Sequence, residues 1–214
     1  TGVRTEGRAV TALECVDDEG RFLVEAKAFV DTTGDANVVH LAGAPTLWGD
    51  ENGNVQAATL PFRLSGVDTS CDLTPQAVEK AVIRAKEEGI PHLTKEKGFI
   101  LKREGSDQVA VLLPSTIPAG LDCQELTRME LDTRRQVLYY VEAFKKYLHG
   151  MENCELTVIG PAIGFRETRR MKGKEIITAE DVLGRRKRPD GVARAGWKPE
   201  IHMDANKMGT YIEV

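Results

Sequence analysis

The amino-acid sequence predicts a mixed α/β fold of the α+β kind. Residues 8–16 and 21–29 are two strand-like segments around the turn Asp17-Asp-Glu-Gly20, which is typical of a β-hairpin. Residues 123–148 carry apolar side chains at helical spacing. The sequence contains no internal repeat and no low-complexity tract, so we expect ordinary globular structure.

A strand, a turn and a short helix are predicted to follow the hairpin. The strand carries Phe29 and Val30, and the helix is expected over residues 35–41, because glycine and proline follow it. Residues 46–56 are mostly Gly, Asp, Asn and Glu with one Trp, and we interpret them as a loop that crosses into a second domain. The predicted domains are residues 1–45 and 46–214.

The second domain is predicted to hold the remaining elements. In chain order these are a strand at 59–64, a helix from Thr74-Pro75 to about 88, a hairpin of 99–102 and 108–113, the helix at 123–148, a strand at 156–159 and a short helix after Thr178. Thr74 is a suitable N-cap with proline at the first helical position. Thr178 and Asp181 have the spacing of a capping box.

The long helix at 123–148 has one apolar face, on which Thr133 is the polar exception. The apolar residues of this face are Leu126, Met129, Val137, Val141, Phe144 and Leu148. Glu130 with Arg134, and Glu142 with Lys146, form i,i+4 pairs on the other side. We expect the apolar face to pack in the core and the charged pairs to face water, so neither indicates a binding site.

The composition is that of a folded cytoplasmic protein, with 41% hydrophobic and 29% charged residues among 214. A net charge of −4 argues against nucleic acid or an anionic membrane as partner. No run approaches the roughly 18 apolar residues that span a bilayer, and no signal peptide is visible.

The cysteines and histidines are isolated from one another in the sequence. None of the four cysteines forms a C-x-x-C pair, so they predict neither a zinc site nor a redox-active dithiol. We expect reduced cysteines and no metal site.

The segment Asp31-Thr-Thr-Gly-Asp-Ala36 joins the predicted strand to the short helix. Gly34 leaves room for a ligand to come close, and Asp35 can direct its carboxylate at a hydroxyl donor. Alternatively, the segment is a simple strand-to-helix turn in which Asp35 is the helix N-cap.

Four motifs in this order resemble the middle of bacterial FAD-dependent oxidoreductases with a glutathione-reductase-like fold. They are Thr32-Thr-Gly-Asp35 followed by Ala42-Gly-Ala-Pro45, then Gln56-Ala-Ala-Thr-Leu-Pro-Phe-Arg-Leu-Ser-Gly-Val-Asp68, Ile163-Gly-Phe-Arg-Glu-Thr-Arg-Arg170, and Ala193-Arg-Ala-Gly-Trp197 with Ile201-His202. The resemblance implies part of an FAD-binding domain (the hairpin and its last strand) followed by a substrate-binding or cap domain. It also implies that Thr33, Gly34 and Asp35 contact FAD, that Asp35 holds the ribityl chain, and that hydride passes between substrate and flavin.

Two features of that family are missing from the sequence: the Gly-x-Gly-x-x-Gly turn that binds the pyrophosphate, and the closing Gly-rich segment. We therefore interpret the chain as a piece of a longer protein, whose remainder is its partner in holding FAD. One Asp–hydroxyl bond offers about 3 kcal/mol, whereas micromolar binding needs about 8 kcal/mol. We expect this chain alone to be colourless and inactive.

Arg166, Arg169 and Arg170 concentrate positive charge after a predicted strand and a Gly-Pro turn. Guanidinium groups can grip a carboxylate or phosphate through paired hydrogen bonds, which favours contact with the flavin or an anionic substrate. The alternative is structural ion pairing with Glu167 and other acids. The resemblance places the segment near the active site, with Arg166 as a catalytic candidate and Arg169 and Arg170 as substrate-binding candidates.

Arg194, Trp197 and His202 occur in a loop with glycine and proline, which suits the lining of a substrate pocket. His202 is a catalytic candidate, because its ordinary pKa lies near neutral pH; the alternative is a structural histidine. The basic run at 185–188 lacks interleaved aromatic residues, so we interpret it as a solvated helix end.

A function of another class is also open. The chain could be a non-enzymatic binding module that holds an anionic ligand or a partner protein through its arginines. Under this hypothesis Asp35 is a helix cap, and the strand-turn-helix element is merely shared with flavoproteins.

Overall fold

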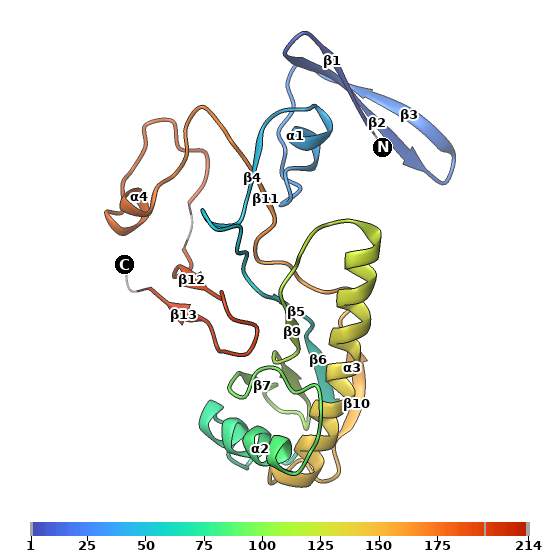
Figure 1. The fold of residues 1–214 in the computed structure, drawn as a ribbon, viewed down its shortest axis with the longest axis vertical. Coiled ribbons are helices and arrows are strands. Elements are labelled where there is room, and N and C mark those ends of the chain that lie inside the picture. The colour runs from blue at the N-terminus through green and yellow to red at the C-terminus, as the bar shows by residue number, and fades with distance from the viewer. Residues whose placement is uncertain (1, 195, 213–214) are drawn as a thin grey trace. The chain divides into compact units, whose positions relative to one another are not determined.

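The computed structural model describes residues 2–194 and 196–212 (Figure 1). It contains 23% helix and 24% strand, which confirms the predicted mixed fold. By compactness the chain forms two units. The first unit takes its described residues from Thr1–Asn54 and Glu167–Ala195, and the second from Val55–Arg166 and Gly196–Glu213. The predicted domain boundary after residue 45 stays a prediction.

The first unit begins with three antiparallel strands in the order β1-β2-β3: β1 Gly2–Glu6, β2 Ala9–Asp17 and β3 Gly20–Glu25. The predicted hairpin is thus confirmed. Asp17 forms its turn by accepting hydrogen bonds from the backbone N–H groups of Glu19 and Gly20. This sheet also contacts α1, which spans Asn37–Leu41.

The predicted strand at Phe29 and Val30 is wrong. Residues 26–36 contain no strand, and Val30 is 86% exposed. A strand is stabilised by pairing along its edges, and no described segment pairs with this one.

The predicted loop at 46–56 contains a short strand that the sequence did not indicate. It is β4, Thr46–Trp48, which pairs antiparallel with β11, Arg169–Met171. This ladder joins the Arg-rich segment to the first third of the chain. The first unit is completed by α4, Ala179–Leu183, whose capping box between Thr178 and Asp181 confirms the prediction.

The second unit is built on a four-stranded antiparallel sheet in the order β10-β6-β8-β7. Its strands are β6 Phe62–Ser65, β7 Ile100–Lys102, β8 Val109–Val111 and β10 Glu155–Ile159. Two further ladders pair β5 (Ala58–Thr59) with β9 (Ser115–Thr116), and β12 (Glu200–Ile201) with β13 (Thr210–Tyr211). The predicted strand at 59–64 is split between β5 and β6 around Pro61, which cannot donate to a ladder.

Two helices bury the hydrophobic core of the second unit. They are α2, Pro75–Glu87, and α3, Cys123–Tyr147; α2 packs against α3, and α3 runs beside β10 (Figure 1). The core includes Phe62 and Leu64 of the sheet and Tyr140 and Phe144 of α3. The predicted Thr74 cap of α2 and the predicted apolar face of α3 are confirmed.

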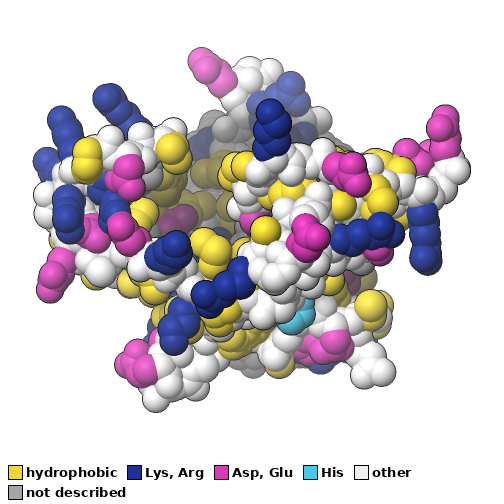
Figure 2. All heavy atoms as spheres, turned by 90° about the horizontal axis from the view of Figure 1, so that it is seen from above, with side chains coloured by type: hydrophobic (Ala, Val, Ile, Leu, Met, Phe, Trp, Pro, Cys, Tyr) yellow, Lys and Arg dark blue, Asp and Glu magenta, His cyan; other side chains and the backbone are white. Residues whose placement is uncertain are grey.

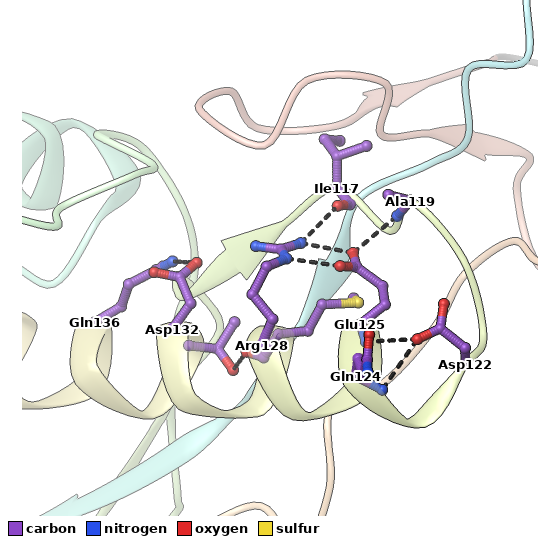
Figure 3. A network of polar contacts seen from close by, with 10 residues as sticks. Ile117, Ala119, Asp122, Gln124, Glu125, Arg128, Asp132 and Gln136 are labelled. Atoms are coloured by element: carbon purple, nitrogen blue, oxygen red, sulfur yellow. Dashed lines mark hydrogen bonds and ion pairs between the residues drawn. The ribbon is translucent and has the colours of Figure 1, made fainter.

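The start of α3 is fixed by acidic side chains (Figure 3). Asp122 accepts hydrogen bonds from the backbone N–H groups of Gln124 and Glu125. Glu125 accepts from the Arg128 guanidinium and from the backbone N–H of Ala119. The hydrogen bond from Arg128 lowers the pKa of Glu125 to about 2, so this end of the helix stays charged and anchored.

Charge of both signs is distributed over the surface. On the face drawn in Figure 2, Lys and Arg side chains are interspersed with Asp and Glu, and neither sign forms a continuous surface there. Within the described residues, no helix combines the length and the apolar character that crossing a membrane requires.

Candidate functional site

The turn before α1 is held by Asp31 and Thr33. The Asp31 carboxylate accepts from the Thr33 backbone N–H and hydroxyl (3.0 and 2.7 Å) and from the Val39 N–H (3.1 Å). Burial raises the pKa of Asp31, but these hydrogen bonds outweigh it and leave the pKa below its usual value. Thr33 in turn accepts from the Asn37 N–H at 3.0 Å. Its hydroxyl therefore supports the helix start.

Asp35 is not the helix N-cap, so that alternative is wrong. The cap residue is Ala36, which has a left-handed backbone and no side-chain cap. The Asp35 carboxylate accepts a 2.5 Å hydrogen bond from the Thr168 hydroxyl through Oδ1, and within the described residues nothing donates to its Oδ2. Gly34 has a φ of +82°, and a Cβ built there would have no heavy atom within 4 Å.

Arg169 and Arg170 make structural contacts inside the first unit. Arg169 donates to the Asp35 carbonyl (3.2 Å) and to Oδ1 of Asn37 (2.6 Å). Arg170 pairs with Glu167 at 2.9 Å and donates to the Gly49 carbonyl. These contacts match the structural alternative, and a substrate-binding role for either arginine stays a prediction.

The other two substrate-binding candidates lie on exposed chain. Arg194 is exposed in the first unit, and Trp197 is 76% exposed in the second. Ala195, which belongs to the same sequence motif, lies outside the described residues. The pocket-lining role of Arg194 and Trp197 stays a prediction.

Arg166 belongs to the second unit, where it borders β5. Its Nη1 donates to the Ala57 carbonyl at 2.9 Å and to the Thr59 hydroxyl at 2.6 Å. The side chain as a whole is exposed, and within the described residues no partner is seen for Nε or Nη2. Partial desolvation lowers the pKa of Arg166, although the charge of Glu200 raises it. The guanidinium keeps donors available for a ligand.

His202 is buried directly after β12. Its backbone is fixed by the side chain of Gln56 and the N–H of Ala57, at 3.0 and 2.7 Å. Nε2 lies 3.1 Å from Oε2 of Glu200, whose pKa is lowered by this hydrogen bond. Burial lowers the pKa of His202 despite the neighbouring carboxylate. The imidazole is therefore neutral at pH 7, with its proton on Nε2 facing Glu200.

The second ring nitrogen of His202 has no partner. Nδ1 is fully buried and makes no hydrogen bond with any described residue. Gly209 packs against the ring, because a Cβ built at this glycine would overlap the imidazole atoms. In the neutral imidazole, Nδ1 is therefore an acceptor without a hydrogen bond among the described residues, whereas Nε2 bonds to Glu200. The structural-histidine alternative thus accounts for Nε2 and not for Nδ1.

Lys95 is the charged residue of this region that the sequence did not single out. The residue is 3% exposed, and its ammonium, which keeps some contact with solvent, makes neither a hydrogen bond nor an ion pair with the described residues. Burial, and then the charge of Arg166, lower the pKa of Lys95 to about 8. Lys95 and Arg166 also both act electrostatically on His202.

A buried polar network holds the backbone of Lys95 in place. Tyr140 on α3 donates to the Lys95 carbonyl at 2.7 Å. One turn earlier, the side-chain amide oxygen of Gln136 accepts hydrogen bonds from the Thr94 hydroxyl and the Ser115 N–H. Its amide NH₂ donates to the Ser115 carbonyl, and the three distances are 2.8 to 3.0 Å. Gln136 also reaches Asp132, as Figure 3 shows. The Lys95 loop is therefore pinned to α3 and β9 by groups that are themselves satisfied.

Two further sequence predictions concern metal ions and cysteines. The described residues contain no group of three His, Cys, Asp or Glu side chains suited to a metal ion. All four cysteines are free. Cys154 is buried, and its burial raises its pKa, whereas Cys123 is exposed.

Comparison with known proteins identifies the family. The family described as FAD dependent oxidoreductase matches residues 1–213, so the chain belongs to the FAD-dependent oxidoreductases. This confirms the resemblance seen in the sequence, and the family implies FAD as the cofactor of the intact protein. Comparisons with curated proteins and with solved structures gave no match.

The turn at 33–35 fits a hydroxylated cofactor. Open space above Gly34 permits close approach of a ligand, and the unengaged Oδ2 of Asp35 can accept a hydrogen bond from a ligand hydroxyl. Thr168 and Arg169 fix the position of Asp35 by donating hydrogen bonds to its Oδ1 and to its carbonyl oxygen. Thr33, Gly34 and Asp35 are thus compatible with the cofactor contact that the resemblance implies.

Proposed function

We propose that this FAD-dependent oxidoreductase transfers hydride between a small anionic substrate and the flavin, with His202 and Arg166 as its catalytic residues. The observation that carries the proposal is the buried imidazole of His202, whose Nδ1 has no hydrogen-bond partner among the described residues. When bound, FAD supplies the hydride acceptor or donor. Thr33, Gly34 and Asp35 would hold it through its hydroxyl-bearing chain.

The protein's part in the reaction is proton transfer and orientation. Oxidation of the substrate breaks one C–H bond, whose electron pair leaves as hydride, and one neighbouring O–H or N–H bond. Nδ1 of His202 accepts that second hydrogen as a proton while the C=O or C=N double bond forms. Glu200 keeps the proton of the neutral imidazole on Nε2 and stabilises the imidazolium that results. Arg166 binds the anionic group through the donors that Ala57 and Thr59 leave free.

Binding of the cofactor is expected to need more than this chain. The sequence holds no Gly-x-Gly-x-x-Gly turn, and the contacts of Asp35 supply only part of the free energy of micromolar binding. We therefore expect the 214-residue chain alone to be colourless and inactive. Its free cysteines suit a reducing, cytoplasmic setting.

The first test is the visible spectrum of the natural full-length gene product, purified beside the 214-residue chain. We expect flavin bands in the longer protein alone. Anaerobic mixing with a panel of small carboxylates and phosphates then identifies compounds that bleach the flavin. Flavin bands in neither protein, even after FAD is added, would overturn the proposal and favour the binding module.

Substitution separates the role of His202 from general damage. His202→Gln removes the proton acceptor and is expected to slow flavin reduction by about 10²- to 10⁴-fold. The matched control is His149→Gln, because His149 is highly exposed in the same unit. An unchanged reduction rate in His202→Gln would assign this histidine a structural role.

A further inference from the structure

The second unit has a pocket between α2 and the end of α3, two helices that pack against each other (Figure 1). Its volume is about 400 Å³, which is within the range of sites that hold small organic molecules. Neither Arg166 nor His202 lines it. What this pocket binds therefore does not depend on the proposed hydride transfer. We call it the α2 pocket.

The apolar part of the α2 pocket is formed by Ala77, Ala81 and Leu148. Ala77 and Ala81 lie one turn apart on α2, where their small side chains leave space along the helix. Ala81 and Leu148 belong to the hydrophobic core, so the pocket reaches down to the core. This part of the lining suits an apolar body rather than a hydrated ion.

The cationic part of the α2 pocket is formed by Lys80 and Arg84, which are exposed four residues apart on the same face of the helix. Cζ of Arg84 lies 5.1 Å from the centre of the Tyr147 ring, a cation–π contact that holds the guanidinium at the pocket. Within the described residues, neither cation makes a hydrogen bond or an ion pair. Like charges at this spacing repel each other, and a bound anion relieves the repulsion.

Asp72 is the acid of the lining, and the fold already uses its carboxylate. It accepts a 2.9 Å hydrogen bond from the backbone N–H of Thr74, the N-cap of α2. Hydrogen bonds with Thr74 lower the pKa of Asp72, so this side chain is charged at pH 7. Counted over Lys, Arg, Asp and Glu, two positive charges against one negative charge leave the lining with a net charge of +1.

We propose that the α2 pocket binds a small organic carboxylate with an apolar body. Arg84 and Lys80 hold the carboxylate, because a guanidinium can meet both of its oxygens and an ammonium adds a point charge. The body lies against Ala77, Ala81 and Leu148. A monocarboxylate matches the net charge of the lining, whereas a phosphate dianion exceeds it.

The test is calorimetric titration of the natural full-length protein at pH 7. The probes are benzoate, its neutral isostere benzamide, acetate, which lacks the apolar body, and phenyl phosphate, which carries a dianion. Benzoate is expected to bind at least tenfold more tightly than each of the other three. Equal binding of benzamide or acetate would overturn the combination of charge and apolar body. Tighter binding of phenyl phosphate would overturn the carboxylate.

Substitutions locate the binding site. Arg84→Gln is expected to weaken benzoate binding by about 10- to 100-fold and to leave benzamide binding unchanged. Ala77→Leu fills the pocket without changing its charge, and it is expected to weaken the binding of both probes. Arg135→Gln is the matched control, because Arg135 is exposed on α3 about 18 Å from Tyr147 along the helix axis. It is expected to bind benzoate like the wild type.

A variant of the proposed active site shows which site takes the probe. Arg166→Gln is expected to keep its benzoate binding. Binding that is lost in Arg166→Gln and unchanged in Arg84→Gln would place benzoate at Arg166 and overturn the inference. Lys80→Gln changes an exposed side chain and is expected to weaken benzoate binding at least threefold, so unchanged binding in it and in Arg84→Gln would also overturn the inference. Far-ultraviolet circular dichroism of each variant verifies that a lost heat signal does not come from unfolding.

Discussion

The largely buried side chain of Lys95 predicts a specific dependence of stability on pH. Its pKa falls from the ordinary 10.5 to about 8 in the folded chain. Each tenfold change in proton affinity corresponds to about 1.4 kcal/mol, so the folded state is penalised by about 3 kcal/mol while Lys95 is charged. Lys95→Met should remove this penalty.

The sign of the effect follows from proton binding. Between pH 8 and 10.5 the unfolded chain holds the Lys95 proton and the folded chain does not, so this lysine makes stability rise with pH in that window. Below pH 8 both states are protonated and the full penalty applies. Lys95→Met should therefore be more stable than the wild type at pH 7, by up to about 3 kcal/mol, and this difference should shrink towards pH 10.

Urea unfolding followed by circular dichroism measures this difference at pH 7, 8, 9 and 10, in buffers free of carboxylates. The difference between wild type and variant cancels the titration of the other lysines and tyrosines. Lys97→Met serves as control, and its effect should stay below about 1 kcal/mol and show no such trend. A constant difference from pH 7 to 10, or a less stable Lys95→Met at pH 7, would refute the unpaired buried charge.

Three further outcomes are expected. Gly209→Ala places a methyl group in the His202 ring and should destabilise the chain by about 1–3 kcal/mol in urea unfolding, with a smaller loss in a His202→Ala background. Gln136→Leu strands the backbone and hydroxyl groups that its amide satisfies, so it should cost about 2 kcal/mol or more by the same measurement. Cys123 should react with a thiol reagent in the native chain, whereas Cys154 should react only after denaturation, as peptide mapping of the labelled protein can show.

Local signals in the sequence predicted the elements that form from neighbouring residues. The cap of α2 follows from Thr74-Pro75, and the capping box of α4 follows from Thr178 and Asp181, because each motif satisfies backbone groups a few residues away. The strand predicted at Phe29 and Val30 failed, because apolar composition supplies no pairing partner. The β4–β11 ladder was missed for the converse reason: its partners lie more than a hundred residues apart.

The candidate site shows the same limit of prediction from local sequence. Arg166 and His202 belong to sequence motifs that resemble the family, and in the second unit both bond the backbone of Ala57: Arg166 donates to the Ala57 carbonyl, and the Ala57 N–H donates to the His202 carbonyl. Lys95 sits in Thr-Lys-Glu-Lys, a stretch that looks like solvated surface when it is read alone.

The backbone of Lys95 is bonded to α3, whose buried face carries Gln136 and Tyr140 among apolar residues. On a core-facing helix such polar side chains must find partners, and here their partners are the loop of Lys95 and the start of β9. Gln136 and Tyr140 on the apolar face of the helix were therefore the sequence feature that could have indicated a polar loop packed against α3. Gln136 and Tyr140 thus find their partners in the same loop that they hold in place, so the stability of α3 and the conformation of the Lys95 loop are expected to depend on one network.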